Sequence, residues 1–179
     1  MESFSPIPLA NDAQYLQNLG VFHSNWSAID LYTDFAIFQF LKVTPEQAHI
    51  ITSGMMFGRK ARLLDDLIRH SNDQRKPKLL EAFNKIRAAK GDIISHSYVK
   101  SDMLTVTFLE KNISGSFKTK PHTYSAKDFY DHVKTTADAA KAFFAALECN
   151  QDDINAFAEA AVNLTNKSST SPGSPLESK

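Results

Sequence analysis

The sequence has one cysteine, Cys149, among 179 residues, so an intramolecular disulfide framework is excluded and the chain suits a reducing compartment. Neither sign of charge dominates, because 20 Lys and Arg residues balance 20 Asp and Glu residues. The chain therefore lacks the global basic excess that is typical of nucleic-acid-binding proteins. Any site for a nucleic acid must be local.

Long apolar runs are also missing. The longest apolar-rich stretch, about residues 35–43, is far shorter than the roughly 20 residues that a membrane-spanning helix needs, and Gln39 and Lys42 interrupt it. The first residues contain no basic cluster followed by an apolar segment, so we expect no secretory signal. These features predict a cytoplasmic protein that has no membrane partner.

Several catalytic motifs are absent. The histidines are scattered, and no His-Glu-x-x-His, cysteine pair or acidic loop accompanies them, so we expect neither a metal site nor a cofactor. No glycine-rich phosphate loop joins a strand to a helix, and no Gly-x-Ser-x-Gly motif occurs. The sequence therefore argues against nucleotide hydrolases and esterases.

What is present predicts a mainly α protein. The length and the 42% hydrophobic content allow one sizeable core. Periodicity indicates a four- to five-helix bundle with a small β-hairpin inserted before the last long helix. We expect one helical domain over residues 1–164, with the first 20 or so residues forming an arm or a short helix. A disordered tail should follow over residues 165–179.

The predicted helices differ in how clearly they are marked. The first is apolar on two sides, so it is either the central helix of the bundle or part of a subunit interface. The second has a clear start, with Thr44 as N-cap, Pro45 in the first turn and Gln47 at the capping-box position. Lys60 projects into the apolar stripe of this helix. The helices should span about 22–42, 44–70, 77–97, 125–147 and 150–164, and the strands 104–109 and 116–120.

Residues 85–97 combine basic residues, an acid and a histidine near the end of the third predicted helix. On a helical wheel, Arg87 and Lys90 fall within the apolar stripe, where a charge needs a partner or an escape to solvent. Asp92 and His96 lie on the other face at positions i and i+4, where a carboxylate can orient an imidazole. A break at Gly91, or a second subunit, would be needed to bring the two sets together.

Basic groups beside a histidine can bind a phosphate and move a proton, which is what RNA cleavage without a metal requires. The layout resembles the HEPN superfamily, helical domains of bacterial toxins and defence systems. In that family a late helix carries an arginine, usually a polar residue next, and a histidine about five to seven positions after the arginine. The resemblance covers roughly residues 22–147. Its other marks are the aromatic-rich helix at Trp26, the Arg59-Lys60-Ala61-Arg62-Leu63-Leu64 stretch, and a hairpin followed by Tyr-Ser-Ala-Lys-Asp-Phe.

The resemblance implies a metal-independent endoribonuclease or an RNA-binding protein in which two subunits share a cleft. His96 matches the family histidine, which assists attack by the ribose 2′-hydroxyl. Lys90 has the spacing of the family arginine but lacks its bidentate fork, Arg87 lies further upstream, and Gly91 stands where a polar residue is usual, with Asp92 after it. The implied partners are RNA, a second copy of the chain, and a cognate antitoxin or another protein.

Two further basic residues, Arg59 and Lys60, are candidate substrate contacts. The simpler interpretation of Lys60, Arg87 and Lys90 is that their side chains snorkel from an apolar face to solvent. His96 then caps a helix end or lies in an interface. The alternative function is a non-catalytic, dimeric protein-interaction module built on a helical bundle.

Overall fold

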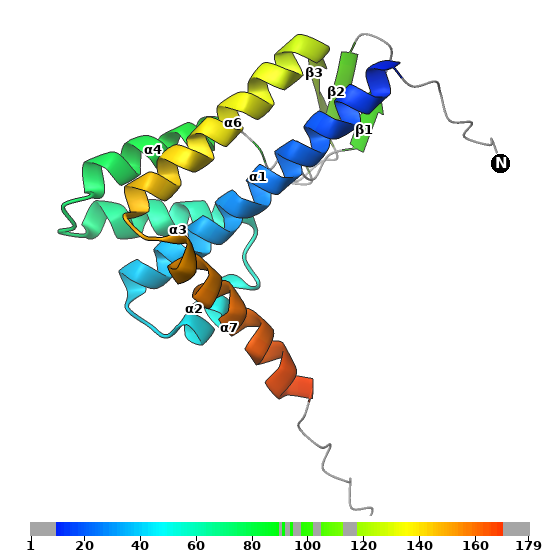
Figure 1. Ribbon diagram of the computed structural model, residues 1–179. Helices are drawn as coiled ribbons and strands as arrows, with labels where there is room; N and C mark the ends of the chain where they lie inside the picture. The colour runs from blue at the N-terminus through cyan, green and yellow to red at the C-terminus, as the bar shows by residue number, and fades with distance from the viewer. Residues whose placement is uncertain are drawn as a thin grey trace, which may run out of the picture.

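The computed structural model describes residues 10–89, 91, 94, 98–101, 105–112 and 118–169, and within them the side chains of residues 13–89, 91, 94, 105–109 and 120–164. The fold is mainly α, as predicted. Figure 1 labels its helices and strands. The helices are α1 (Ala10–Leu41), α2 (Pro45–Thr52), α3 (Phe57–His70), α4 (Lys76–Ala88), α6 (Ala126–Leu147) and α7 (Gln151–Ser169), and the strands are β1 (Tyr98–Ser101), β2 (Thr105–Asn112) and β3 (Lys118–Ser125).

Helix α1 is the central helix of the bundle. It contacts α6, α3, α2 and α7, and it buries Phe22, Ile29 and Ile37 on one side and Phe35 on another. The first of the two interpretations of its two-sided apolar pattern is therefore confirmed. From residue 10 on, the expectation of an arm or a separate short helix is wrong, because α1 begins at Ala10 and continues through Gly20.

The second predicted helix is divided into α2 and α3. Its start is as predicted: Gln47 N donates to Thr44 Oγ1 (3.3 Å) and Thr44 N donates to Gln47 Oε1 (3.0 Å), which is a complete capping box. The prediction of one continuous helix is wrong. The helix stops at Thr52, just before Gly54, a poor helix former. After this break α2 contacts α7, whereas α3 contacts α4.

Helix α4 ends at Ala88, about nine residues before the predicted end near Ser97. The amide of Ala89 donates to the carbonyls of both Lys85 and Ile86, each at 3.1 Å, which is the tightening typical of a helix terminus. By Tyr98 the chain is already a β-strand. Before its end, α4 packs against α6, where the rings of Phe83 and Phe143 lie 5.4 Å apart.

The predicted hairpin is confirmed as β2 and β3, and β1 adds a third strand that was not predicted. The strand order is β1-β2-β3, antiparallel throughout. Val106 and Phe108 are buried, as the alternating pattern predicted, and Phe108 lies 5.6 Å from Phe129 of α6. Strand β3 continues to Ser125 and includes Pro121, which an edge strand tolerates because its outer amides bind no neighbouring strand.

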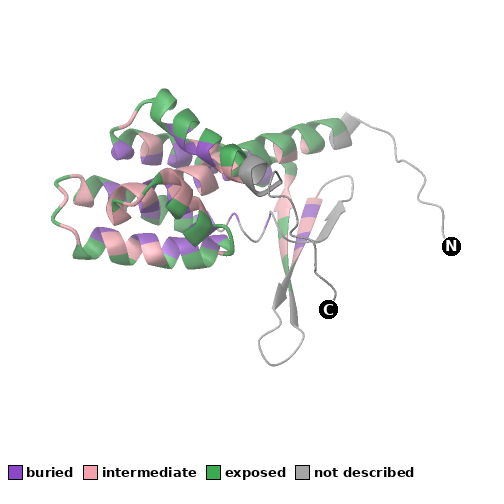
Figure 2. Ribbon diagram, turned by 90° about the horizontal axis from the view of Figure 1, so that it is seen from below, coloured by how far each residue is buried: buried purple, intermediate pink, exposed green. Residues whose placement is uncertain are grey.

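The sheet lies at the end of the molecule where α1 and α6 begin, and α2 and α7 lie toward the opposite end of α1 (Figure 1). Buried residues line the spaces between the helices (Figure 2). Helix α7 continues to Ser169, so the expected disordered tail does not begin at residue 165. Within the described ranges, no helix has both the length and the apolar character needed to span a bilayer.

Candidate functional site

Only some of the residues predicted to act on RNA lie in the part of the chain that the structure describes. Lys90, Asp92 and His96 lie outside the described residues. Arg87 is described, in the last turn of α4. Its side chain is 47% exposed rather than within the apolar stripe, and its Nη1 lies 3.6 Å from Asp65 Oδ1 on α3. The structure thus brings Arg87 next to α3.

Gly91 fixes where the chain goes after α4. It is buried, and a Cβ added to it would lie 2.2 Å from the ring of Trp26, far closer than atoms can approach. Ile94, three residues later, is 2% exposed. The stretch that contains the predicted motif is therefore held against the core at Gly91 and at Ile94. Only glycine fits where the backbone meets Trp26.

Two arginines pair with one carboxylate where α3 meets the end of α4. Arg69 donates to Asp65 through Nε (2.8 Å) and Nη2 (3.3 Å), and Arg87 reaches the same carboxylate from α4. Arg62 is exposed and lies three positions before Asp65, which places it on the same side of α3. We call Arg62, Arg69 and Arg87 the arginine cluster.

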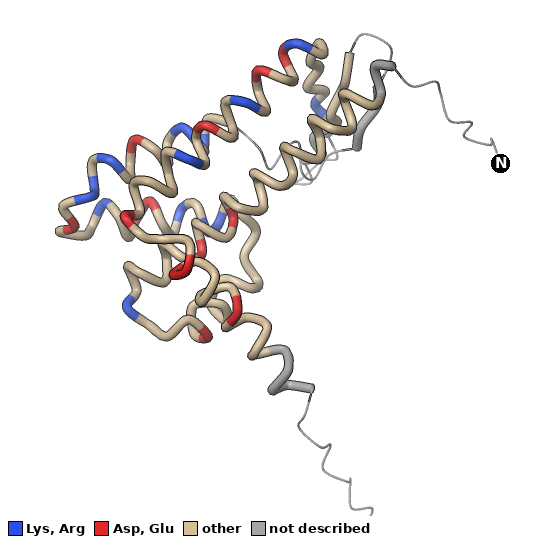
Figure 3. Tube along the Cα trace, in the orientation of Figure 1, with Lys and Arg blue, Asp and Glu red and all other residues tan. Residues whose placement is uncertain are grey.

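Asp65 is the acid that pairs directly with this cluster. Its hydrogen bond with Arg69 holds the pKa of the Asp65 carboxyl below its usual range, so the carboxylate is charged at neutral pH. The neighbouring Asp66 lines a different hollow with Phe40 and Leu67, and its charge also acts on Arg69. Three guanidinium groups against the two carboxylates of Asp65 and Asp66 leave one positive charge. Figure 3 shows the positions of the basic residues along α3 and α4.

Lys60, the other predicted substrate contact, lies inside the protein. It is 6% exposed, and its Nζ donates to Asp30 Oδ1 (3.1 Å), Asp30 Oδ2 (3.0 Å) and Asp34 Oδ2 (2.9 Å). An ammonium group has three N–H donors, so none is left for a substrate. The side chain does not snorkel to solvent either. The Lys60 side chain therefore has a structural role, because its bonds to Asp30 and Asp34 join α3 to α1.

The charges of this triad depend on one another. Burial alone would lower the pKa of Lys60, but hydrogen bonds to Asp34 and Asp30 more than offset it, and the pKa is raised. Burial raises the pKa of Asp34, against the opposing effect of Lys60. The Thr52 side chain also lowers this pKa, although Asp34 Oδ1 has no hydrogen bond of normal geometry within the described chain.

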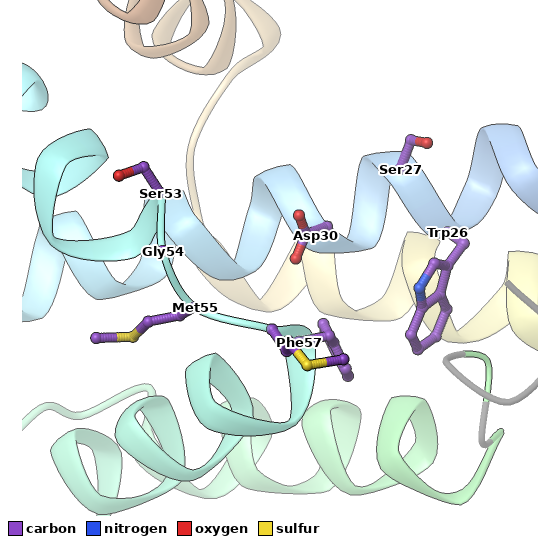
Figure 4. A pocket seen from close by; sticks show the side chains of 8 residues that line it. Trp26, Ser27, Asp30, Ser53, Gly54, Met55 and Phe57 are labelled. Carbon is purple, nitrogen blue, oxygen red and sulfur yellow. The ribbon is translucent and has the colours of Figure 1, made fainter. Parts of the chain in front are cut away.

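Arg59 and the triad border different surfaces. Arg59 is exposed in the first turn of α3, on the side turned away from the core. Asp30, which is 40% exposed, borders a groove of about 480 Å³ between α1 and the segment that joins α2 to α3. Figure 4 shows Asp30 between Trp26 and this segment. The groove is lined by Trp26, Ser27, Asp30, Ser53, Gly54, Met55, Met56 and Phe57.

Sequence reasoning missed Asp30 and Asp34. Both are acids on a helix that buries apolar residues on two sides, and they stand four positions apart, where like charges repel each other. Lys60 was noted as a charge within an apolar stripe. Together, two repelling acids and an isolated cation signal a buried ion pair between two helices.

No protein-family model, no curated protein and no solved structure matches this chain. In the ranges that the structure describes, no three His, Cys, Asp or Glu side chains lie close enough together to hold a metal ion.

Proposed function

We propose that this chain is a HEPN-like helical domain that binds RNA at the end of α4 and cleaves it without a metal ion, in the cytoplasm and in a toxin or defence system. The arginine cluster carries the proposal. It leaves a net positive charge on an exposed surface, and neutralisation of phosphates supplies most of the affinity for RNA. The cluster includes Arg87, three residues before Lys90.

In this proposal each motif residue has a defined task. His96 takes the proton of the ribose 2′-hydroxyl as that oxygen attacks the phosphorus, and Asp92 orients the imidazole. Lys90 neutralises the phosphate under attack, and Arg87 holds an adjoining phosphate. The 2′-oxygen forms a cyclic phosphate, and the departing 5′-oxygen takes up a proton. Arg59 is a further candidate contact with the RNA, whereas Lys60 has no donor to offer.

The proposal includes a homodimer in which both motif segments border one cleft, and an antitoxin that controls it. The position of Gly91 supports a defined site, because the segment on either side of it starts from a backbone that is held against Trp26. A fixed backbone is what a catalytic histidine needs if it is to meet a phosphate reproducibly.

The affinity of single-stranded RNA for two matched variants tests the role of the cluster. Arg87→Gln removes a cation that is shared with Asp65, whereas Lys85→Gln removes an exposed cation of the same helix, one that pairs with Glu81. In fluorescence anisotropy titrations at fixed salt, we expect Arg87→Gln to weaken binding by roughly fivefold to tenfold, about 1 kcal/mol, and Lys85→Gln to have little effect. Equal affinities for the two variants would contradict the proposal.

A second candidate, a dimeric interaction module without catalysis, is favoured by the surface of α1. From Ala13 to Ile29 this helix has no charged residue, as the uncharged upper part of α1 in Figure 3 shows. Leu16 and Val21 are 59% and 45% exposed on it. A two-fold interface brings like residues together, so a surface without charge suits self-association.

Sedimentation and RNA assays separate the two candidates. The module predicts that the wild type dimerises, that Leu16→Glu makes it monomeric, and that neither protein binds or cleaves RNA. The enzyme predicts RNA cleavage by the wild type. Gln17→Glu is the matched control for Leu16→Glu, because it adds the same charge at the next exposed position of α1.

A further inference from the structure

The groove between α1 and the α2–α3 segment carries a negative charge for which the described residues show no second cation partner. Its carboxylate, Asp30, shares the single ammonium of Lys60 with Asp34. With both carboxylates ionised, the triad has a net charge of −1. Lys60 and Asp34 are largely buried, with 7% and 13% of their side chains exposed, whereas Asp30 is 40% exposed. The excess charge is therefore available to a ligand through Asp30.

Asp30 can accept further hydrogen bonds while it keeps Lys60. A carboxylate has about four lone-pair sites, and Lys60 uses one on each oxygen. A cation that enters the groove would meet the remaining sites from the solvent side. It would also lower the repulsion between the two carboxylates, since Asp30 is one cause that raises the pKa of Asp34.

The walls of the groove suit an aliphatic stem. Trp26 and Phe57 are nearly buried, with ring centroids 4.6 Å apart and ring planes tilted by 58°, so little of either ring is open to the groove. Met56 is 69% exposed at the rim. Methionine adapts its shape to irregular partners and is frequent at binding surfaces. Ser27 and Ser53 add exposed hydroxyl groups.

We propose that this groove binds the basic side chain, lysine or arginine, of a protein partner. The stem of that side chain lies along Met56 and the edge of Trp26, and its ammonium or guanidinium group donates to Asp30. A peptide is the favoured source because the groove is open along an exposed rim that includes Ser53 and Gly54, where a partner's backbone can run (Figure 4). The inference does not depend on the proposed RNA chemistry.

Fluorescence of Trp26 provides the measurement, because it is the only tryptophan of the chain and lies in the groove. The probes are a capped leucine-rich peptide with one arginine, the same peptide with neutral citrulline, and spermidine. We expect saturable binding of the arginine peptide and binding of the citrulline peptide that is about tenfold weaker or more, the range of a charge-assisted hydrogen bond. Competition by spermidine supports the same cation chemistry. Spermidine that binds while the peptide does not would overturn the assignment to a peptide.

Three variants locate the site. Asp30→Asn should weaken the arginine peptide at least about tenfold. Ser27→Lys, at an exposed position three residues before Asp30, should abolish binding by supplying an internal ammonium, and it keeps the test valid if Asp30→Asn unfolds. Asp66→Asn is the matched control, because that carboxylate borders a different hollow. Circular dichroism checks the fold. Wild-type affinity in both Asp30→Asn and Ser27→Lys, or equal binding of the citrulline peptide, would overturn the proposal.

Discussion

Lys60 of α3 and Asp34 of α1 form an ion pair of 2.9 Å across the interface of two helices, with 7% and 13% of their side chains exposed. Burial of both charges carries a large desolvation cost, so the intact pair adds little net stability. Removal of one partner is strongly destabilising, because it leaves the other charge buried and unpaired. This asymmetry makes Lys60 a sensitive test of how α3 is held against the central helix.

Lys60→Met should lower the free energy of unfolding by about 3 kcal/mol, because it leaves Asp34 buried without its cation. Urea denaturation followed by circular dichroism measures the loss. The control, Arg59→Met, changes an exposed neighbour and should alter stability by less than about 0.5 kcal/mol. The double variant Lys60→Met, Asp34→Leu should recover part of the loss. A single Lys60→Met variant as stable as the wild type would show that the pair is not important for folding.

Gly91→Ala should destabilise the protein by about 1 to 3 kcal/mol, since its Cβ would overlap the ring of Trp26. The matched control is Gly58→Ala on α3, where an added Cβ meets nothing within 4 Å. It should stabilise the protein by about 0.5 to 1 kcal/mol through its higher helix propensity. Thermal unfolding monitored by Trp26 fluorescence distinguishes the two. If both substitutions shift stability in the same direction, the backbone does not meet Trp26 as described.

His132 should make stability depend on pH. It is packed beside Phe22 and Tyr124, its Nε2 has no hydrogen-bond partner within the described chain, and burial lowers its pKa below 6.5. Between that lowered pKa and 6.5 the unfolded chain binds more protons than the folded one. The stability that the neutral His132 ring contributes is therefore fully present above pH 6.5, and it is lost as the pH falls through the pKa that His132 has in the folded state.

The variant His132→Phe keeps an aromatic ring at this position but cannot gain a proton. Urea denaturation at a series of pH values from 5 to 8 should show a steeper loss of stability on acidification for the wild type than for the variant. Identical slopes would mean that the ring of His132 gains a proton as easily in the folded state as in the unfolded one.

The arginine cluster should determine how salt affects RNA binding. Each cation that contacts a phosphate contributes about 0.7 to the slope of log affinity against log salt concentration for a single strand. Arg62→Gln and Arg69→Gln should each reduce that slope by about this amount. Lys141→Gln on the exposed face of α6 should not. Slopes that are the same in all the variants would place the RNA elsewhere.

Local features of the sequence predicted much of the fold. The capping box at Thr44 and the Ser125 start of α6 depend on residues three positions apart, so their chemistry is visible in the sequence. The alternation at Val106 and Phe108 predicted the inner face of β2 in the same way. The two-sided apolar pattern of α1 led to the central helix because a second apolar face must be covered.

Tertiary relationships were not predictable in this way. A glycine costs a helix only about 1 kcal/mol, so nothing local decides between a continuous helix and the break at Gly54. The four residues of β1 form a strand through pairing with β2. The partners of Lys60 come from a helix some 30 residues earlier, and only the packing of α1 on α3 brings them together.

The most direct test of the RNA proposal is incubation of the purified protein with single-stranded RNA in the presence of EDTA. The proposed mechanism requires cleavage that leaves cyclic phosphate ends, and a loss of activity of roughly a hundredfold or more in His96→Ala with its helical content unchanged. A well-folded wild type that leaves the RNA intact, or a His96→Ala variant that cleaves it equally well, would exclude this mechanism.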